Sequence, residues 1–302
     1  MSQQADTPPK TTVTRDDVEH RIALIGSWLA PRLDAEAQRW LSDQLARVGG
    51  GENKTALAMA IGLAPRKLGT APLALDDVER EAAARLVPGI ETRSWTVDCA
   101  GRILFLLACF NGDEAAFVER LETLQRDGEL GEQIALLRGL AVFPAPKGLV
   151  AIAGEGIRSA MQPVFEAVAH DNPYPAAHFS EPMWNQMVVK SLFIESRLAP
   201  IQGLDDRRNA DLARMLVDYA HERWAAGRTV SPELWRCVGP FASDDYFSDL
   251  MRVFRSGDAT ARKAAALALS ECPTPQALTT LETVPTLWRD IRAGRVDWNS
   301  IE

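Results

Sequence analysis

The sequence has 302 residues, of which 46% are hydrophobic and 25% are charged, with a formal net charge of -8 and a pI near 5.2. An acidic chain without a basic stripe repels a phosphate backbone, so nucleic acid is excluded as a partner. The longest continuous apolar run, residues 103–110, is far shorter than the roughly 20 residues of a membrane-spanning helix, so we predict a protein that does not span the membrane.

The amino terminus and the cysteines together indicate a cytoplasmic protein. Residues 1–14 are polar, contain prolines and lack an apolar h-region, so we predict a disordered leader and not a signal peptide. The four cysteines show no Cys-x-x-Cys spacing. Cys99 and Cys109 lie in an apolar run, where a free cysteine behaves as a small hydrophobe. We therefore expect reduced, structural cysteines.

Apolar residues recur at helical spacing along almost the whole chain, and no convincing stretch alternates with a period of two. Thr14 is the expected N-cap of a first helix that ends near Pro31. Asp34 opens a second helix, which ends at the glycines of residues 49–51. Further helices are predicted over residues 53–63, 76–87, 94–110, 113–126 and 129–142.

Prolines divide the second half of the chain. Residues 144–146 and 172–175 bracket a long helical stretch over residues 150–170, and a change of layer is expected near 144–150. The remaining predicted helices cover residues 183–195, 210–226, 244–255 and 258–271.

These patterns predict an all-α fold without significant sheet, in which residues 15–302 form a single helical domain. The segments 244–255 and 258–271 resemble a HEAT-like helical pair, which a right-handed solenoid would repeat. No repeat of fixed period runs through the chain, so an irregular helical array is favoured over a regular solenoid.

The most familiar-looking motif is the glycine-rich segment at residues 49–55, which ends in Lys54-Thr55 and resembles a phosphate-binding loop. A P-loop needs glycine directly before the lysine and a strand before the loop. Asn53 occupies the glycine position here, and the preceding segment has a helical pattern. We interpret this segment as a loop between two helices.

Metal and nucleophile motifs are also missing from the sequence. His20, His170, His178 and His221 lack the spacing of a known metal site, and His221-Glu222 is not followed by the second histidine of a zincin helix. No Gly-x-Ser-x-Gly elbow occurs. We predict neither a metal nor a cofactor, and the sequence identifies no catalytic residue.

A dense polar and aromatic belt between about Glu155 and Trp224 is where we expect a functional surface. Helical spacing places Arg214, Asp218 and His221 on one stripe, which suits anion recognition or proton transfer near neutral pH. An ordinary i,i+4 ion pair between Arg214 and Asp218 on a solvated face explains the spacing equally well. The ligand-binding candidates in this belt are Arg158, Asn172, Tyr174, Trp184, Asn185, Lys190, Gln202, Asp205, Arg214, Asp218 and His221.

Several of these candidates also have structural interpretations. Trp184 belongs to an apolar stripe that fits a core, Asn172 before a proline fits a turn, and Asp205 fits the cap of the next helix. Arg158 follows a segment with glycine on both sides of Glu155, which lets a backbone or a ligand approach closely. Arg158 is therefore a candidate anion anchor.

At this belt the chain resembles the EboA family. The likeness rests on residues 155–159, 172–175, 184–190, 201–205 and 215–224, and a weaker likeness extends from about residue 28 to residue 269. The resemblance implies a cytosolic helper in secondary-metabolite biosynthesis or traffic, which binds a metabolite precursor, proteins of the same gene cluster, or both. It assigns no catalytic residue.

Three hypotheses follow from the residues and the resemblance. The leading one is a helical groove that binds an apolar or aromatic metabolite, lined by Trp184, Tyr174 and Arg158. The second is a protein scaffold without a ligand pocket. The third is an enzyme that uses His221 and Asp218 as an acid–base pair. The first and third need the helices at 150–170, 183–195 and 210–226 to share a cleft.

Overall fold

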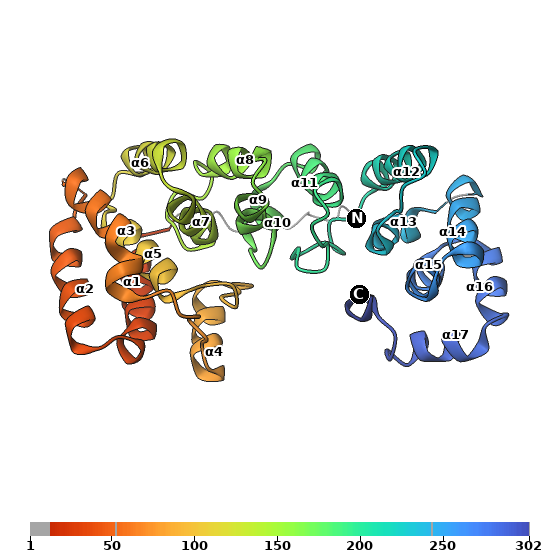
Figure 1. The fold of residues 1–302 in the computed structure, drawn as a ribbon, viewed down its shortest axis with the longest axis horizontal. Coiled ribbons are helices and arrows are strands. Elements are labelled where there is room, and N and C mark those ends of the chain that lie inside the picture. Colours follow the sequence, from red (N-terminus) through yellow and green to blue (C-terminus); the bar gives the residue numbers. More distant parts are fainter. Residues whose placement is uncertain (1–12, 52, 243, 302) are drawn as a thin grey trace, which may run out of the picture. The chain divides into compact units, whose positions relative to one another are not determined.

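The computed structural model describes residues 13–51, 53–242 and 244–301, and over these residues it confirms the all-α prediction (Figure 1). The only strand-like pairing in these ranges is an isolated bridge between Pro72 and Thr96. The chain divides into two compact units, the first ending at His178 and the second beginning at Phe179. The single-domain arrangement and the HEAT-like solenoid stay predictions, and residues 1–12 of the predicted leader lie outside the described residues.

The first unit contains ten α-helices in its described part. Their bounds are α1 (Arg15–Leu29), α2 (Ala35–Val48), α3 (Lys54–Leu68), α4 (Asp77–Leu86), α5 (Val97–Ala108), α6 (Glu114–Asp127), α7 (Leu130–Arg138), α8 (Val150–Arg158), α9 (Gln162–Ala169) and α10 (Tyr174–His178).

The apolar helix α5 is the centre of this unit. Residues Val97 to Leu107 are buried without interruption, so α5 has no solvent face. Helices α1, α2, α3 and α7 pack around it. Helix α7 also packs on α6, and α8 packs on α9 (Figure 1). A helix that is buried on all sides requires such an enclosure.

The first helices begin where their caps predict. The Thr14 side chain accepts a hydrogen bond from the Asp17 amide and the Asp17 carboxylate accepts one from the Thr14 amide, which completes a capping box. The Asp34 carboxylate accepts from the amides of Glu36 and Ala37. Both predicted N-caps are confirmed. Their side chains accept hydrogen bonds from backbone amides of the first turn, which have no acceptor within the helix.

The predicted helical stretch over residues 150–170 is broken in the structure. Helix α8 ends at Arg158 and α9 begins at Gln162, with Pro163 in its first turn. A proline fits a first turn but cannot continue an upstream helix, so a continuous helix was the wrong prediction here. The glycines around Glu155 do allow a close approach, because a Cβ on Gly156 would lie 2.6 Å from Val168 of α9.

A proline inside α3 also determines how α3 joins α5. Pro65 has no amide hydrogen, so the Ile61 carbonyl lacks its usual partner within the helix. The Arg102 Nε of α5 donates to this carbonyl at 3.1 Å. Arg102 also pairs with Asp98 at 3.1 Å, and both side chains are more than 90% buried. A buried ion pair thus completes the backbone hydrogen bonding of a neighbouring helix.

The second unit contains seven α-helices among its described residues. They are α11 (Glu181–Phe193), α12 (Ala210–Ala225), α13 (Trp235–Val238), α14 (Asp244–Ser256), α15 (Ala259–Glu271), α16 (Pro275–Glu282) and α17 (Pro285–Arg292).

The alanine-rich helix α15 is the centre of the second unit. It packs against α13, α14, α16 and α17, while α11 packs on α12 (Figure 1). The backbone at Gly239 approaches α15 so closely that only a small residue fits, since a Cβ on Gly239 would lie 2.6 Å from the Ala268 carbonyl oxygen. In the described ranges of both units, no helix is both long and apolar enough to cross a membrane.

Candidate functional site

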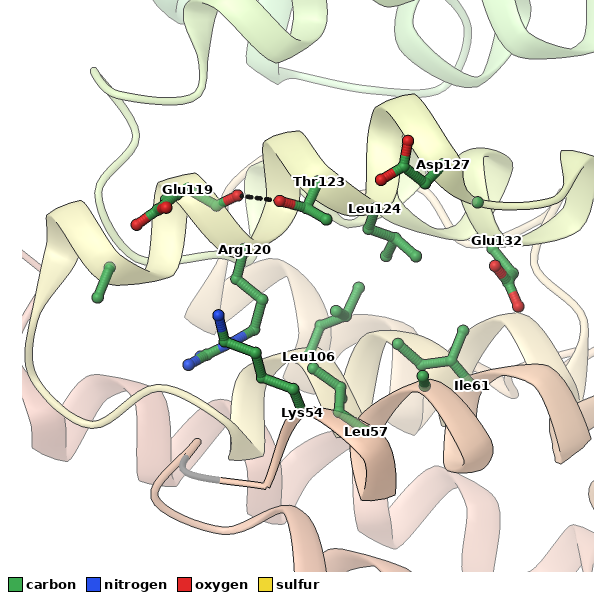
Figure 2. A pocket seen from close by; sticks show the side chains of 13 residues that line it. Lys54, Leu57, Ile61, Leu106, Glu119, Arg120, Thr123, Leu124, Asp127 and Glu132 are labelled. Atoms are coloured by element: carbon green, nitrogen blue, oxygen red, sulfur yellow. Dashed lines mark hydrogen bonds between the residues drawn. The ribbon is translucent and has the colours of Figure 1, made fainter.

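A hollow of the first unit with a mainly apolar lining lies between α3 and α6, above α5, and has a volume of about 360 Å³ (Figure 2). Its volume is near the lower end of the range for small-molecule sites, roughly 300–1,000 Å³. Its apolar lining comes from Leu57, Ala58 and Ile61 of α3, Leu106 of α5, and Ala116 and Leu124 of α6. We name it the α3–α6 pocket.

Helical spacing explains why these side chains meet. Lys54, Leu57, Ala58 and Ile61 follow the i, i+3, i+4, i+7 pattern of a single helix face. Both α3 and α6 pack on neighbours in the α5–α7 core, and the facing stripes of the two helices leave the pocket between them. Leu106 is 1% exposed and forms part of the floor.

One end of the α3–α6 pocket carries Arg120 and Lys54, and Glu119 of α6 also lines the pocket there. Arg120 of α6 donates from Nη1 to the Cys109 carbonyl at 3.0 Å and from Nη2 to the Gly51 carbonyl at 2.8 Å. Its buried Nε has no hydrogen-bond partner. Lys54, at the start of α3, also lines the pocket, and Figure 2 draws it toward the same end as Arg120. The positive end of the α3 dipole adds to the potential of these two side chains.

Gly51 makes the Arg120 arrangement possible. Its φ is +74°, a conformation that other residues rarely adopt, and a Cβ there would collide with the Cys109 carbonyl oxygen and the Arg120 guanidinium. The glycine-rich segment before Lys54 therefore positions a guanidinium by its backbone carbonyl. As predicted, the segment is a loop between two helices.

The opposite end is acidic. Asp127 ends α6, and Glu132 lies in the first turn of α7 (Figure 2). The Glu132 carboxylate accepts from the Glu129 amide at 3.1 Å as part of a capping box, which fixes its position. The α3–α6 pocket thus has an apolar middle, with both cationic side chains beside Glu119 at one end and two carboxylates at the other, a lining that can orient an amphiphilic molecule.

The belt candidates of the first unit lie elsewhere. Arg158 is exposed and pairs with Glu155 at 2.5 Å, and this pair holds the pKa of Glu155 below its usual value. Asn172 is 4% exposed, accepts from the Tyr174 amide in the predicted turn and donates to the Leu137 carbonyl. Tyr174 is 2% exposed and its hydroxyl donates to the Pro146 carbonyl. These contacts are structural.

Three of the ligand-binding candidates, Trp184, Asn185 and Lys190, lie on α11. Trp184 is fully buried, and the Arg207 guanidinium carbon lies 4.6 Å from the centre of its ring. Asn185 exchanges two amide hydrogen bonds with Asn209, at 2.9 and 3.1 Å. Lys190 is partly buried, which lowers its pKa. The core interpretation of Trp184 is confirmed.

The loop before α12 differs from expectation. Asn209, and not Asp205, caps α12 by accepting from the Leu212 amide at 2.8 Å. Asp205 instead forms a two-point ion pair with Arg236, at 2.7 and 2.8 Å, which lowers the pKa of Asp205. The capping interpretation was wrong because three residues separate Asp205 from the N-cap position, which Asn209 occupies. Gln202 is partly exposed.

The polar stripe of α12 does not form the predicted acid–base arrangement. Arg214 contacts Asp218 at 3.5 Å, with both side chains more than half exposed, which confirms the solvated ion pair. His221 Nε2 lies 2.8 Å from Asp249 Oδ2 of α14. The cleft predicted to join 150–170 with 183–195 and 210–226 spans two units and stays a prediction. Within the second unit α11 does pack on α12.

Sequence reasoning missed the α3–α6 pocket because its signals resemble ordinary core packing. Leu57, Ile61 and Leu106 fit buried stripes, and Lys54 ends a segment that resembles a P-loop. The available signal was the glycine loop beside a lysine at a helix start. Across the described ranges, no group of three or more His, Cys, Asp or Glu side chains gathers to hold a metal.

Fold and pocket together define an all-helical protein with an apolar hollow and without a recognisable metal or nucleophile motif. The family model described as metabolite traffic protein EboA matches residues 21–239, and the chain belongs to this family. The match includes every residue that lines the α3–α6 pocket. No curated protein and no solved structure matches the chain.

Proposed function

We propose that this protein acts in metabolite traffic by binding a small, largely apolar metabolite in the α3–α6 pocket and handing it on unchanged. The observation that carries the proposal is the apolar lining between α3 and α6, with charged side chains only at its ends. Ligand sites typically combine an apolar wall with a few placed polar groups. The family description supports a role in traffic.

The lining also indicates the shape of the metabolite. The apolar middle fits a flat or branched hydrocarbon body, and Lys54 and Arg120 fit an acidic group at one end of it. Arg120 is held by two carbonyls, so its guanidinium is preorganised and loses little entropy on binding.

We favour a carrier over the two other hypotheses that the sequence raised, a protein scaffold and an enzyme. The scaffold hypothesis called for an exposed apolar patch in place of a pocket, and the α3–α6 pocket supports ligand binding. The enzyme hypothesis called for a pairing of His221 with Asp218, but these residues contact Asp249 and Arg214 respectively. Proteins of the same gene cluster remain the proposed recipients of the metabolite.

The test uses 8-anilinonaphthalene-1-sulfonate, an aromatic probe with one anionic group. A ligand of about 20 non-hydrogen atoms at roughly 0.3 kcal/mol per atom binds with a Kd of tens of micromolar. Ala116→Trp fills the pocket from α6, and we expect its affinity to fall by about tenfold or more. Fluorescence titration and calorimetry measure the affinity of the probe for the unchanged protein and for Ala116→Trp.

The matched control is Ala115→Trp, on the exposed side of the same helix. We expect it to bind the probe within about twofold of the unchanged protein, since it lies outside the pocket. Equal affinity for Ala116→Trp and the unchanged protein would refute the α3–α6 pocket as the binding site. Native mass spectrometry of protein from its own host then gives the mass of the natural ligand.

A further inference from the structure

A second hollow, different in chemistry, lies within the second unit. It has a volume of about 730 Å³ and is bounded by the end of α11 and its following loop, the last turns of α12, residues 229–235, and α14 with the start of α15. We name it the arginine cleft, because Arg197, Arg223 and Arg252 line it. These arginines come from three separate elements of an acidic chain.

Two of the guanidinium groups are held by neighbours. Arg252 lies over Trp224, with its guanidinium carbon 4.1 Å from the ring centre. Trp224 stacks in turn on Trp235, at 5.8 Å between ring centres, and Trp235 is 1% exposed. A guanidinium stacked on an indole keeps its N–H groups in its own plane, where they can meet an oxyanion edge-on.

Arg223 is fixed from a different side. Its Nε donates to the Thr229 carbonyl at 2.9 Å, which ties the end of α12 to the loop that follows it. Arg223 also lies near the Tyr219 ring, whose hydroxyl donates to the Leu192 carbonyl at 3.1 Å. The cleft wall between α11 and α12 is therefore rigid where Arg223 meets it.

The acidic groups of the cleft are largely engaged by the backbone. The two Glu233 carboxylate oxygens accept from the amides of Leu198 and Ala199, at 2.8 and 3.1 Å, and Glu233 Oε1 also lies 3.9 Å from Arg197 Nε. Asp258 caps α15 by accepting from the Ala261 amide at 2.8 Å. Glu195 is exposed and lies at the rim. Carboxylates that accept from backbone amides compete less for Arg223 and Arg252, which favours an added anion beside these two arginines.

We propose that the arginine cleft binds the oxyanion group of a small molecule, a phosphate or a carboxylate. Arg223 and Arg252 make the charge-assisted contacts, while Arg197 is paired with Glu233 at the edge of the cleft. The size of the cleft suits a small molecule. This site is independent of the α3–α6 pocket and does not rest on the proposed function.

The test is calorimetric titration of the full chain at low salt, with inorganic pyrophosphate in one arm and citrate in the other. We expect at least one probe to bind with a Kd below about 1 mM, as two or three charge-assisted hydrogen bonds allow. Stronger binding of pyrophosphate identifies a phosphate ligand, and stronger binding of citrate identifies a polycarboxylate. Either result supports the oxyanion site.

The variants localise the binding. Arg252→Gln and Arg223→Gln should each weaken it by about tenfold or more. Arg255→Gln, an exposed change on α14 outside the cleft, alters net charge equally and should change the affinity by less than about twofold. Arg252→Lys keeps the charge but loses the planar fork, and we expect an intermediate affinity.

Thermal melting of each variant shows whether it remains folded. If Arg252→Gln does not fold, Arg252→Lys takes its place in the comparison of affinities. The proposal is overturned if neither probe binds at about 10 mM, well above the expected Kd. It is also overturned if Arg255→Gln weakens binding as much as the cleft variants, because a diffuse charge effect would then explain the data.

Discussion

The two units hold their charged side chains in opposite ways. In the first unit, Asp98 and Arg102 are more than 90% buried and serve a backbone carbonyl of the next helix. In the second unit, Asp205 and Arg236 form a shorter contact, at 2.7 Å, but the Asp205 side chain is 45% exposed. The comparison teaches that burial, more than distance, determines what an ion pair contributes.

The difference extends to the two hollows. The middle of the α3–α6 pocket is apolar, and two of the charged side chains at its ends, Arg120 and Glu132, are held by backbone groups. The arginine cleft is polar, with guanidinium groups supported by aromatic rings and a loop carbonyl. Ligand binding in the pocket should therefore depend weakly on salt, whereas binding in the cleft should weaken as salt is added.

The largest effect is expected from Arg102→Met. Removing the guanidinium leaves the buried Asp98 carboxyl without its cationic partner and leaves the Ile61 carbonyl without a donor, at a cost of about 3–5 kcal/mol in the free energy of unfolding. Urea denaturation measures the loss, and hydrogen exchange should locate it in α3 and α5.

The double variant Asp98→Leu with Arg102→Met is the control. It removes both charges and should recover part of the lost stability, since replacing a whole buried pair is far less costly than breaking it. A single variant as stable as the double variant would contradict the account of this buried pair.

A smaller effect is expected from Gly51→Ala. The new Cβ would meet the Cys109 carbonyl and the Arg120 guanidinium, so the unfolding free energy should fall by about 2–3 kcal/mol and Arg120 should lose its anchor. Gly50→Ala is the matched control, because Gly50 has φ +77° with open space around it and should lose only about 1 kcal/mol. Equal losses would show that backbone strain alone acts at Gly51.

The smallest effect is expected from Asp205→Asn, and it should depend on pH. The folded state lowers the pKa of Asp205, so the ion pair stabilises the fold above the unfolded pKa of about 3.9 and loses this effect as pH falls through the folded value. At pH 7 we expect a loss of about 1 kcal/mol, reduced by solvent screening.

Melting curves from pH 7 down to about pH 3 test this dependence, since Asp205 protonates within or below that range. The melting temperatures of Asp205→Asn and the unchanged protein should converge toward the acid end. A constant difference across the series would mean that Asp205 acts through packing or hydrogen bonding alone.

The sequence was sufficient for the fold class and for most helices, because caps such as Thr14 and Asp34 and the apolar periodicity act locally. The break before α9 was missed although Pro163 signalled it. The site was harder to predict, because whether two apolar stripes touch or leave a hollow depends on tertiary spacing. Asn172 and Trp184 stand out in sequence, yet their contacts are structural.

Pro65 also bears on the order in which the first unit assembles. Helix α3 cannot complete its backbone hydrogen bonds alone, because the donor to the Ile61 carbonyl is Arg102 of α5, some forty residues later in the chain. An isolated α3 peptide should therefore be less helical than its composition suggests, and α3 should become fully protected from exchange only as α5 docks. The formation of α3 is thus coupled to the collapse of the core beneath the pocket.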